Sequence, residues 1–411
     1  RRVTATDRRS EEPEQITDAT PTPVAYRRLM VASVVCMLMF GAVQVLPAVA
    51  LDVLGEDLGL NFEQRGRLFS IRIAAALPAL LLIGHFAERP FKRHVLSWGL
   101  IAIALGQMLI ALASNYAWLL CAVVISGIGL GVVEAIVNPL LVQLHPTRSA
   151  WALNIINAVF ALGLVVGALS TGELLQAGFG WRLTFWLWMI PTLLAAVLYL
   201  TPHYPAPSPT SDSRHVRPDV GSFAANPLFW MLAVAMVFGG GCESGLTSWA
   251  PNFVVEELGA SARGGAWATI LYGSFMAIGR FGIGSIAGGV SPLRIMLVSA
   301  IFCGAATLGL AFAPGLWAAW LLFGLGGLFV SCFWPTLLAV GSDQICVGSM
   351  SLLSLLGTAG IIGSVVVPWV IGALGDAVGL RAGILVLPAS MVLLIVTLVM
   401  IGRRVHPRCV T

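Results

Sequence analysis

Long apolar segments separated by short polar stretches run through almost the whole chain. A helix needs about 20 mostly apolar residues to cross a bilayer. The pattern predicts twelve such spans, at residues 29–51, 66–87, 94–114, 118–142, 149–173, 182–201, 227–250, 265–289, 292–313, 316–339, 348–374 and 382–402. The sequence therefore predicts an all-α membrane protein with twelve transmembrane helices.

Polar stretches divide this series of spans into two halves of six. The longest internal polar stretch is rich in Pro and Ser, which favours a linker over a packed element. We expect a disordered cytoplasmic tail (1–25), a first six-helix half (26–201), a cytoplasmic linker (202–226), a second six-helix half (227–402) and a cytoplasmic tail (403–411).

The two halves resemble each other at a spacing of about 200 residues. FGAVQ…VLGEDLG, at 40–59, matches FGGGCE…VVEELG, at 238–259. GELLQAGFGWR, at 172–182, matches GALGDAVGLR, at 372–381. A shared offset at several places indicates an internal duplication.

Composition and charge agree with a membrane protein and give it an orientation. Only 10% of the residues are charged, whereas soluble domains carry about 25%. With the amino terminus inside, basic residues are concentrated on the cytoplasmic side, which predicts that both termini are cytoplasmic in a cell-membrane protein. The cytoplasmic set is Arg27, Arg28, Arg89, Lys92, Arg93, Arg148, Arg214, Arg217, Arg294, Arg403, Arg404 and Arg408, and the outer set is Arg65, Arg67, Arg182, Arg263 and Arg381.

Other functional classes find no support in the sequence. The seven cysteines lie mostly inside predicted spans and lack the spacing of metal ligands or of a disulfide framework. No nucleophile–base pair suggests an enzyme, and the basic residues follow membrane orientation, so nothing suggests a nucleic-acid partner. We expect no metal and no cofactor.

A small set of polar side chains lies inside the predicted spans. A charged side chain at the bilayer centre costs about 2.5–3.5 kcal/mol on insertion scales, so it usually has a partner or a function. The set comprises Gln44, Arg72, Glu134, Asn138, Asn154, Asn157, Glu243 and Arg280.

Glu134 lies in the middle of a long apolar run, GIGLGVVEAIVNPLLVQL. Gly127, Gly131, Glu134 and Asn138 recur every three or four residues, so in a helix they share one face. The two glycines are expected to let a neighbouring helix approach closely.

Depth along the spans groups Glu134 with three asparagines. At 1.5 Å per residue, Glu134 lies about 6 Å to the cytoplasmic side of the middle of its span. Asn138, Asn154 and Asn157 also fall in the inner half, so the four residues can form one polar cluster.

Two interpretations are open for each acid. A carboxyl group whose surroundings alternate between protein interior and water changes its proton affinity, so Glu134 can carry a proton. Alternatively, Glu134 is a structural acid held by asparagines or by an arginine. Glu243, at a depth close to that of Gln44, has the same two interpretations. Arg72 either pairs with an acid or snorkels to the interface, and Arg280 is expected to be structural.

The loop after the second span, GHFAERPFKR, resembles the cytoplasmic loop signature of the major facilitator superfamily. That signature is a Gly, an acid–Arg pair and two basic residues, and here Glu88 replaces the usual aspartate. The resemblance implies two like-oriented six-helix halves with substrate bound between them near the midplane. It also implies a conformational latch formed by Gly84, Glu88, Arg89 and Arg93. The alternative for this loop is positive-inside anchoring alone.

Four further segments resemble the fucose–galactose–glucose:proton symporter group of that superfamily. They are VEAIVNPLLVQL (133–144), LNIINAVFALG (153–163), CESGLTSWAPNF (242–253) and GLFVSCFWPTLLAVGSD (327–343). The resemblance implies proton coupling at Glu134, with Glu243 as a second candidate. The implied substrate-binding residues are Gln44, Asn138, Asn154, Asn157 and Trp334.

The sequence thus predicts a monomeric, proton-coupled symporter of a monosaccharide or another small polar solute, acting by alternating access. The rival is a proton-coupled antiporter that expels drugs or metabolites. Trp334 precedes Pro335, which is expected to loosen its helix. The Trp334 indole can stack on a sugar ring or can pack beside the proline. Departures from the symporter group at Gln44 and Asn157 leave a less polar substrate open.

Overall fold

A computed structural model describes residues 23–86, 92–144, 149–200, 225–286, 290–345 and 349–404, and these residues contain helices and no strand. The helices of the first half are α1 (Pro23–Val49), α2 (Leu51–Asp57), α3 (Phe62–Phe86), α4 (Lys92–Ala111), α5 (Tyr116–Leu144), α6 (Ser149–Gln176) and α7 (Trp181–Leu200). Those of the second half are α9 (Pro227–Leu258), α10 (Ala262–Ile286), α11 (Pro292–Ala311), α12 (Leu316–Val330), α13 (Phe333–Gln344), α14 (Ser349–Val378), α15 (Leu380–Gly383) and α16 (Val386–Gly402).

The twelve predicted spans are confirmed. Ten spans in the described part of the chain are long and apolar enough to cross a membrane. The other two spans are α3 and α10, which pack in the same bundles and carry several arginines. Each span is one helix, except that α12 with α13 and α15 with α16 form broken spans.

The break in the tenth span lies where a proline was expected to loosen it. Pro335 has no N–H to donate to the carbonyl of Ser331, four residues earlier. In the structure, α12 ends at Val330 and α13 begins at Phe333.

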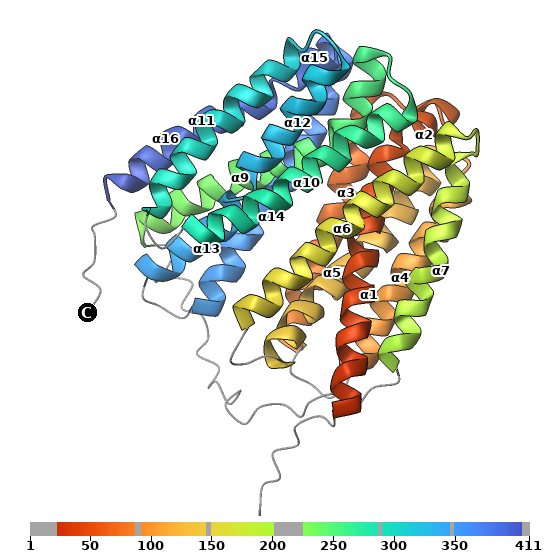
Figure 1. Cartoon of the computed structure of the whole chain (residues 1–411), viewed down its shortest axis with the longest axis horizontal. Helices are drawn as coiled ribbons and strands as arrows, with labels where there is room; N and C mark the ends of the chain where they lie inside the picture. Colours follow the sequence, from red (N-terminus) through yellow and green to blue (C-terminus); the bar gives the residue numbers. More distant parts are fainter. Residues whose placement is uncertain are drawn as a thin grey trace, which may run out of the picture.

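The two halves form separate bundles that meet along two seams (Figure 1). In Figure 1 the helices of the first half lie to the right and those of the second half to the left. One seam joins α3 to α14, and the other joins α6 to α10. The helices α2 and α15 lie at one end of the molecule, and the beginning of α1 lies at the other end. We call these the α2–α15 end and the terminal end.

Matching ion pairs make the internal duplication visible in the structure. Arg182 donates to the Asp57 carboxylate at 2.7 Å in the first half. Arg381 donates to Glu257 at 3.1 Å in the second half, so both partners are displaced by about 200 residues. Each arginine also donates to a backbone carbonyl in the connection that precedes the fourth or the tenth span. The Arg182 guanidinium holds the pKa of Asp57 below its usual value.

Close approach of α3 to α5 depends on two glycines, as expected. A Cβ at Gly127 would overlap the backbone oxygen of Arg72, and a Cβ at Gly131 would overlap that of Ala76. The prediction that these glycines admit a neighbouring helix is confirmed.

Candidate transport site and the gate between the halves

Polar contacts between the two halves are concentrated at the α2–α15 end. Among the described residues, every hydrogen bond and ion pair that joins the halves lies there. The contacts are Phe62 and Glu63 with Asp376, Arg65 with Glu256, Ser70 with the carbonyl of Val365, Glu63 with Trp369, and Glu173 with Arg263. We refer to this set as the gate.

One gate contact is a helix cap supplied by the other half. The N–H groups in the first turn of a helix lack intrahelical acceptors. At the start of α3, the N–H groups of Phe62 and Glu63 donate to the Asp376 carboxylate of α14 at 2.8 and 2.7 Å. The next N–H, of Gln64, donates to the Asn61 side chain at 2.9 Å within the same half.

A second gate contact places one cation between two acids. Arg65 is only 6% exposed. Its Nη1 forms an ion pair with Glu256 of α9 and lies 3.7 Å from the Asp52 carboxylate of α2. Burial, together with the neighbouring Glu256 carboxylate, raises the pKa of Asp52 to about 7.

Glu134 lies away from the gate, toward the terminal end of α5. It is the sole charged residue of α5, and its side chain is exposed although its neighbours Val133 and Ala135 are buried. The Glu134 side chain is therefore not enclosed by its neighbours on α5 or by the helices packed beside it. Among the described residues it has no hydrogen-bond or ion-pair partner.

Arginines do not neutralise Glu134 in the described structure. Arg72 is level with Gly127, and seven residues of helix separate Gly127 from Glu134, or about 10 Å along the axis. Arg280 is bound elsewhere, because its Nη2 lies 3.1 Å from the Glu243 carboxylate.

Glu243 pairs with Arg280 within the second half. An arginine partner was one of the two interpretations open for Glu243, but the sequence did not indicate which arginine. Both side chains are mostly buried, at 23% and 28% exposure. The Thr247 and Tyr272 hydroxyls donate to the backbone oxygen of Glu243 at 2.8 and 3.2 Å, which fixes this part of α9 against α10. The structural role expected for Arg280 agrees with this geometry.

Arg72 adopts neither of the two expected arrangements. It is 5% exposed, which excludes snorkelling, and its described partners are backbone carbonyls rather than an acid. Pro47 of α1 cannot donate to the carbonyl of Val43. Arg72 donates to that carbonyl instead, at 3.0 Å, and to the carbonyl of Gln44 at 3.2 Å.

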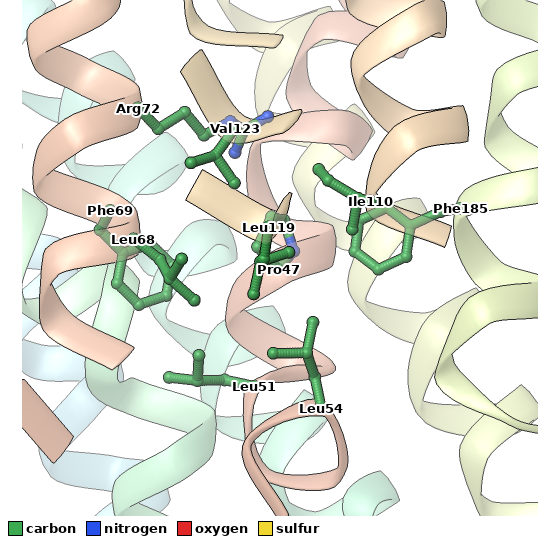
Figure 2. A pocket seen from close by; sticks show the side chains of 10 residues that line it. All are labelled: Pro47, Leu51, Leu54, Leu68, Phe69, Arg72, Ile110, Leu119, Val123 and Phe185. Atoms are coloured by element: carbon green, nitrogen blue, oxygen red, sulfur yellow. The ribbon is translucent and has the colours of Figure 1, made fainter. Parts of the chain in front are cut away.

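The space beside Arg72 is not a substrate site. Figure 2 shows a small pocket with Arg72 as its one charged residue and apolar side chains such as Phe69, Val123 and Phe185 around it. It has room for about one water molecule. A solute of several heavy atoms does not fit.

Two of the remaining predicted site residues are described. Gln44 is partly exposed on α1. Trp334 is also partly exposed, and its six-membered ring packs against Gly360 and Gly240, as the packing interpretation expects. One edge of this indole is therefore fixed inside the second half.

Several predicted residues lie outside what the structure describes. Glu88 and Arg89 of the latch lie outside the described residues. The surroundings of Gly84 and the side chains of Arg93, Asn138, Asn154 and Asn157 also lie outside the description, although their helices are described. The polar cluster around Glu134 and the latch stay predictions.

Glu256 and Asp376 of the gate, and Asp52 beside Arg65, were not predicted from the sequence. Each lies at or beyond the end of an apolar span, where acids are common. A partial signal was present, since Asn61 and Gln64 have the spacing of a capping box that leaves the first two N–H groups of α3 for another partner.

Comparison with known proteins identifies the family. A model of the Major Facilitator Superfamily matches residues 29–351. The cyanate transport protein CynX of Escherichia coli (strain K12) is 25% identical over 80% of this chain and 85% of its own length. The multidrug resistance protein MdtL of Escherichia coli O127:H6 is 26% identical over 92% of this chain and 97% of its own length.

A solved symporter has the same fold. The crystal structure of the E. coli fucose:proton symporter FucP superposes with a TM-score of 0.60 at 18% identity, over 92% of this chain and 99% of that one. The two-bundle architecture, the duplicated ion pairs and the family match agree with one another. The chain belongs to the major facilitator superfamily.

Proposed function

We propose that this protein is a secondary active transporter that couples uptake of a small polar solute to protons, with Glu134 as the coupling acid. The observation that carries the proposal is the state of Glu134. It is the one charged residue of a transmembrane helix, its side chain is exposed, and it has no partner among the described residues. A membrane-embedded acid in such a position is a functional candidate by default.

Orientation links this acid to alternating access. The excess of basic residues at the terminal end supports a cytoplasmic location for that end. The gate then closes the outer side, and Glu134 is accessible from the inside. Rocking of the halves about a central site would close the terminal end and open the gate. A proton on Glu134 removes the charge that closure would otherwise bury.

Glu243 is the weaker candidate for coupling. Arg280 lies 3.1 Å from it, so the pair is already neutral. Adding a proton to Glu243 would leave the Arg280 guanidinium without its partner in a largely buried place, which is costly. We propose that the Glu243–Arg280 pair stabilises the second half.

The substrate is proposed as a class only. Gln44, Asn138, Asn154 and Asn157 supply amide groups for a polar solute, and Trp334 supplies an aromatic face. A monosaccharide fits this set of groups. The names of the similar proteins refer to different substrates, namely cyanate, multiple drugs and fucose.

Antiport is the second candidate, favoured by the relative MdtL, which aligns with 92% of this chain. An antiporter can use the same acid, since substrate and proton then occupy the carrier in alternation. The two modes differ in the direction of the proton gradient that drives accumulation.

Transport in proteoliposomes tests the proposal. A thermal-shift screen of the purified protein against sugars, small anions and lipophilic cations first identifies a ligand. Labelled ligand is then offered to vesicles that are acidic outside, acidic inside or without a gradient. Symport predicts accumulation above equilibrium when the outside is acidic. Accumulation driven by an acidic interior would establish antiport, and equal filling under all three conditions would exclude proton coupling.

A further inference from the structure

We propose that Asp52 and Glu256 form a second proton-binding site, located on the gate, and that loss of their shared proton favours gate opening. The site lies between the two halves and is separate from Glu134. It goes beyond the proposed function, because it concerns the conformational equilibrium in the absence of substrate.

The geometry supplies two acids for one cation. Asp52 belongs to the first half and Glu256 to the second, and both face Nη1 of Arg65. Their side chains are 17% and 29% exposed, so water screens them poorly. With both carboxylates ionised, the three groups carry one net negative charge, and a single shared proton makes them neutral. Two carboxylates at one site keep a proton that either alone would lose.

Arg65 is held in place by the first half. Its Nε donates to the carbonyl of Leu60 at 3.2 Å. Gly55 of α2 lies against the guanidinium so closely that a Cβ there would overlap Nε. Arg65 therefore cannot move freely to follow one acid or the other.

An unpartnered amide lies beside the two acids. Asn252, one turn before Glu256 on α9, is 1% exposed. Neither its side-chain nitrogen nor its oxygen has a hydrogen-bond partner in the described structure, although the side chain lies next to the Glu256 carboxylate. An amide can support a carboxyl in either protonation state without adding charge.

All charged groups that face Asp52 favour retention of a proton, except Arg65. Glu256 faces it from α9, Arg65 from α3, and Glu56 from its own helix. Burial and the two other acids together outweigh the arginine, so the pKa of Asp52 in the closed gate is about 7.

The direction of the pH effect follows from linkage. In an open gate Asp52 leaves Glu256 and becomes exposed, so its pKa falls toward the usual value of about 4. Between about pH 4 and about pH 7 the closed gate then binds more protons than the open gate. Low pH therefore favours the closed gate. As the pH rises from about 4 to about 7, the closed-to-open ratio falls by up to about tenfold per pH unit, and above about pH 7 it no longer changes.

The distance between two spin labels measures the gate without any substrate. Ser114 and Phe312 are exposed, lie in equivalent connections of the two halves, and belong to the α2–α15 end. Both are replaced by Cys in a full-length chain whose native cysteines have been substituted, and the labelled protein is placed in lipid nanodiscs. We expect the ratio of the short-distance to the long-distance population to fall steeply between pH 5 and pH 7.

Four variants separate the gate from other acids. Asp52→Asn and Glu256→Gln each remove the like-charge pair, so each should flatten the pH response. Asp57→Asn removes an acid that pairs within the first half, so it should keep the wild-type slope. Glu134→Gln removes the proposed coupling acid, whose proton favours closure of the terminal end and so opposes the gate effect, and this variant should keep the slope or make it steeper. The proposal is overturned if the wild-type ratio does not change with pH, if Asp52→Asn and Glu256→Gln both keep the slope, or if Glu134→Gln abolishes it.

Discussion

Asp376 caps the first turn of a helix that belongs to the opposite half, where the N–H of Phe62 donates to its carboxylate at 2.8 Å. This cap exists only while α14 lies against the beginning of α3. Opening the gate exposes the N–H groups of Phe62 and Glu63 to water, so the cap links helix stability to the closed state.

Replacing Asp376 by Ala should shift the equilibrium toward the open gate. Loss of a cap costs about 0.5–2 kcal/mol, which corresponds to a fall of about 2- to 30-fold in the closed-to-open ratio. Spin-label distances at the α2–α15 end measure this ratio. Asn61→Ala is the matched control, because Asn61 caps α3 from within the same half and this cap does not depend on contact with α14. An unchanged ratio in Asp376→Ala would show that the inter-half cap does not hold the gate.

Arg72→Met should destabilise the protein because it leaves the carbonyl of Val43 without a donor. The expected loss is about 1–3 kcal/mol, seen as a lower melting temperature in detergent. Pro47→Ala restores an N–H that can donate to the same carbonyl, so the double variant should recover part of the loss. If Pro47→Ala gives no recovery, the main role of Arg72 is not to replace the hydrogen bond that Pro47 removes.

The Glu243–Arg280 pair should act as a unit in stability measurements. Glu243→Gln leaves a partly buried guanidinium unpaired and is expected to cost about 2 kcal/mol, because about a quarter of each side chain is exposed. The double variant with Arg280→Gln should lose less than the sum of the two single changes. Glu257→Gln, which breaks a pair with the more exposed Arg381, is expected to cost under about 1 kcal/mol. Simple additivity of the two single changes at Glu243 and Arg280 would argue against the pair.

The loop between α3 and α4 has its own prediction. If Glu88 and Arg89 hold the cytoplasmic side shut, Arg89→Ala should favour inward-facing states and slow net transport. Accessibility of cysteines from the cytoplasm measures the first effect. Lys92→Ala removes the same charge from the same loop region and serves as the control for positive-inside anchoring. Normal accessibility and normal transport in Arg89→Ala would leave only the anchoring role.

Much of the fold could be predicted because the bilayer imposes length and hydrophobicity on every span. The spacing of about 200 residues also anticipated matching contacts, which Asp57 with Arg182 and Glu257 with Arg381 supply. The arrangement of Arg72 was missed, although the sequence held its cause, because Pro47 and Arg72 lie on neighbouring spans and 25 residues apart.

The gate could not be predicted for a different reason. Contacts such as Arg65 with Glu256 join residues about 190 positions apart in different halves. They depend on which end of the molecule is closed, and one sequence has to encode both conformations. Sequence patterns predict the helices, which both conformations share. They do not indicate at which end of the molecule the two halves are in contact.

Glu134→Gln in proteoliposomes tests the central claim most directly. The amide mimics the protonated acid, so the variant can turn over but cannot use a proton gradient. We predict that uphill uptake with an acidic exterior is lost while substrate exchange at equal pH persists. Wild type and Asp57→Asn, which removes an acid that pairs within the first half, are the controls and should both keep uphill uptake. Retained uphill accumulation in Glu134→Gln would contradict the account and move proton coupling to another acid.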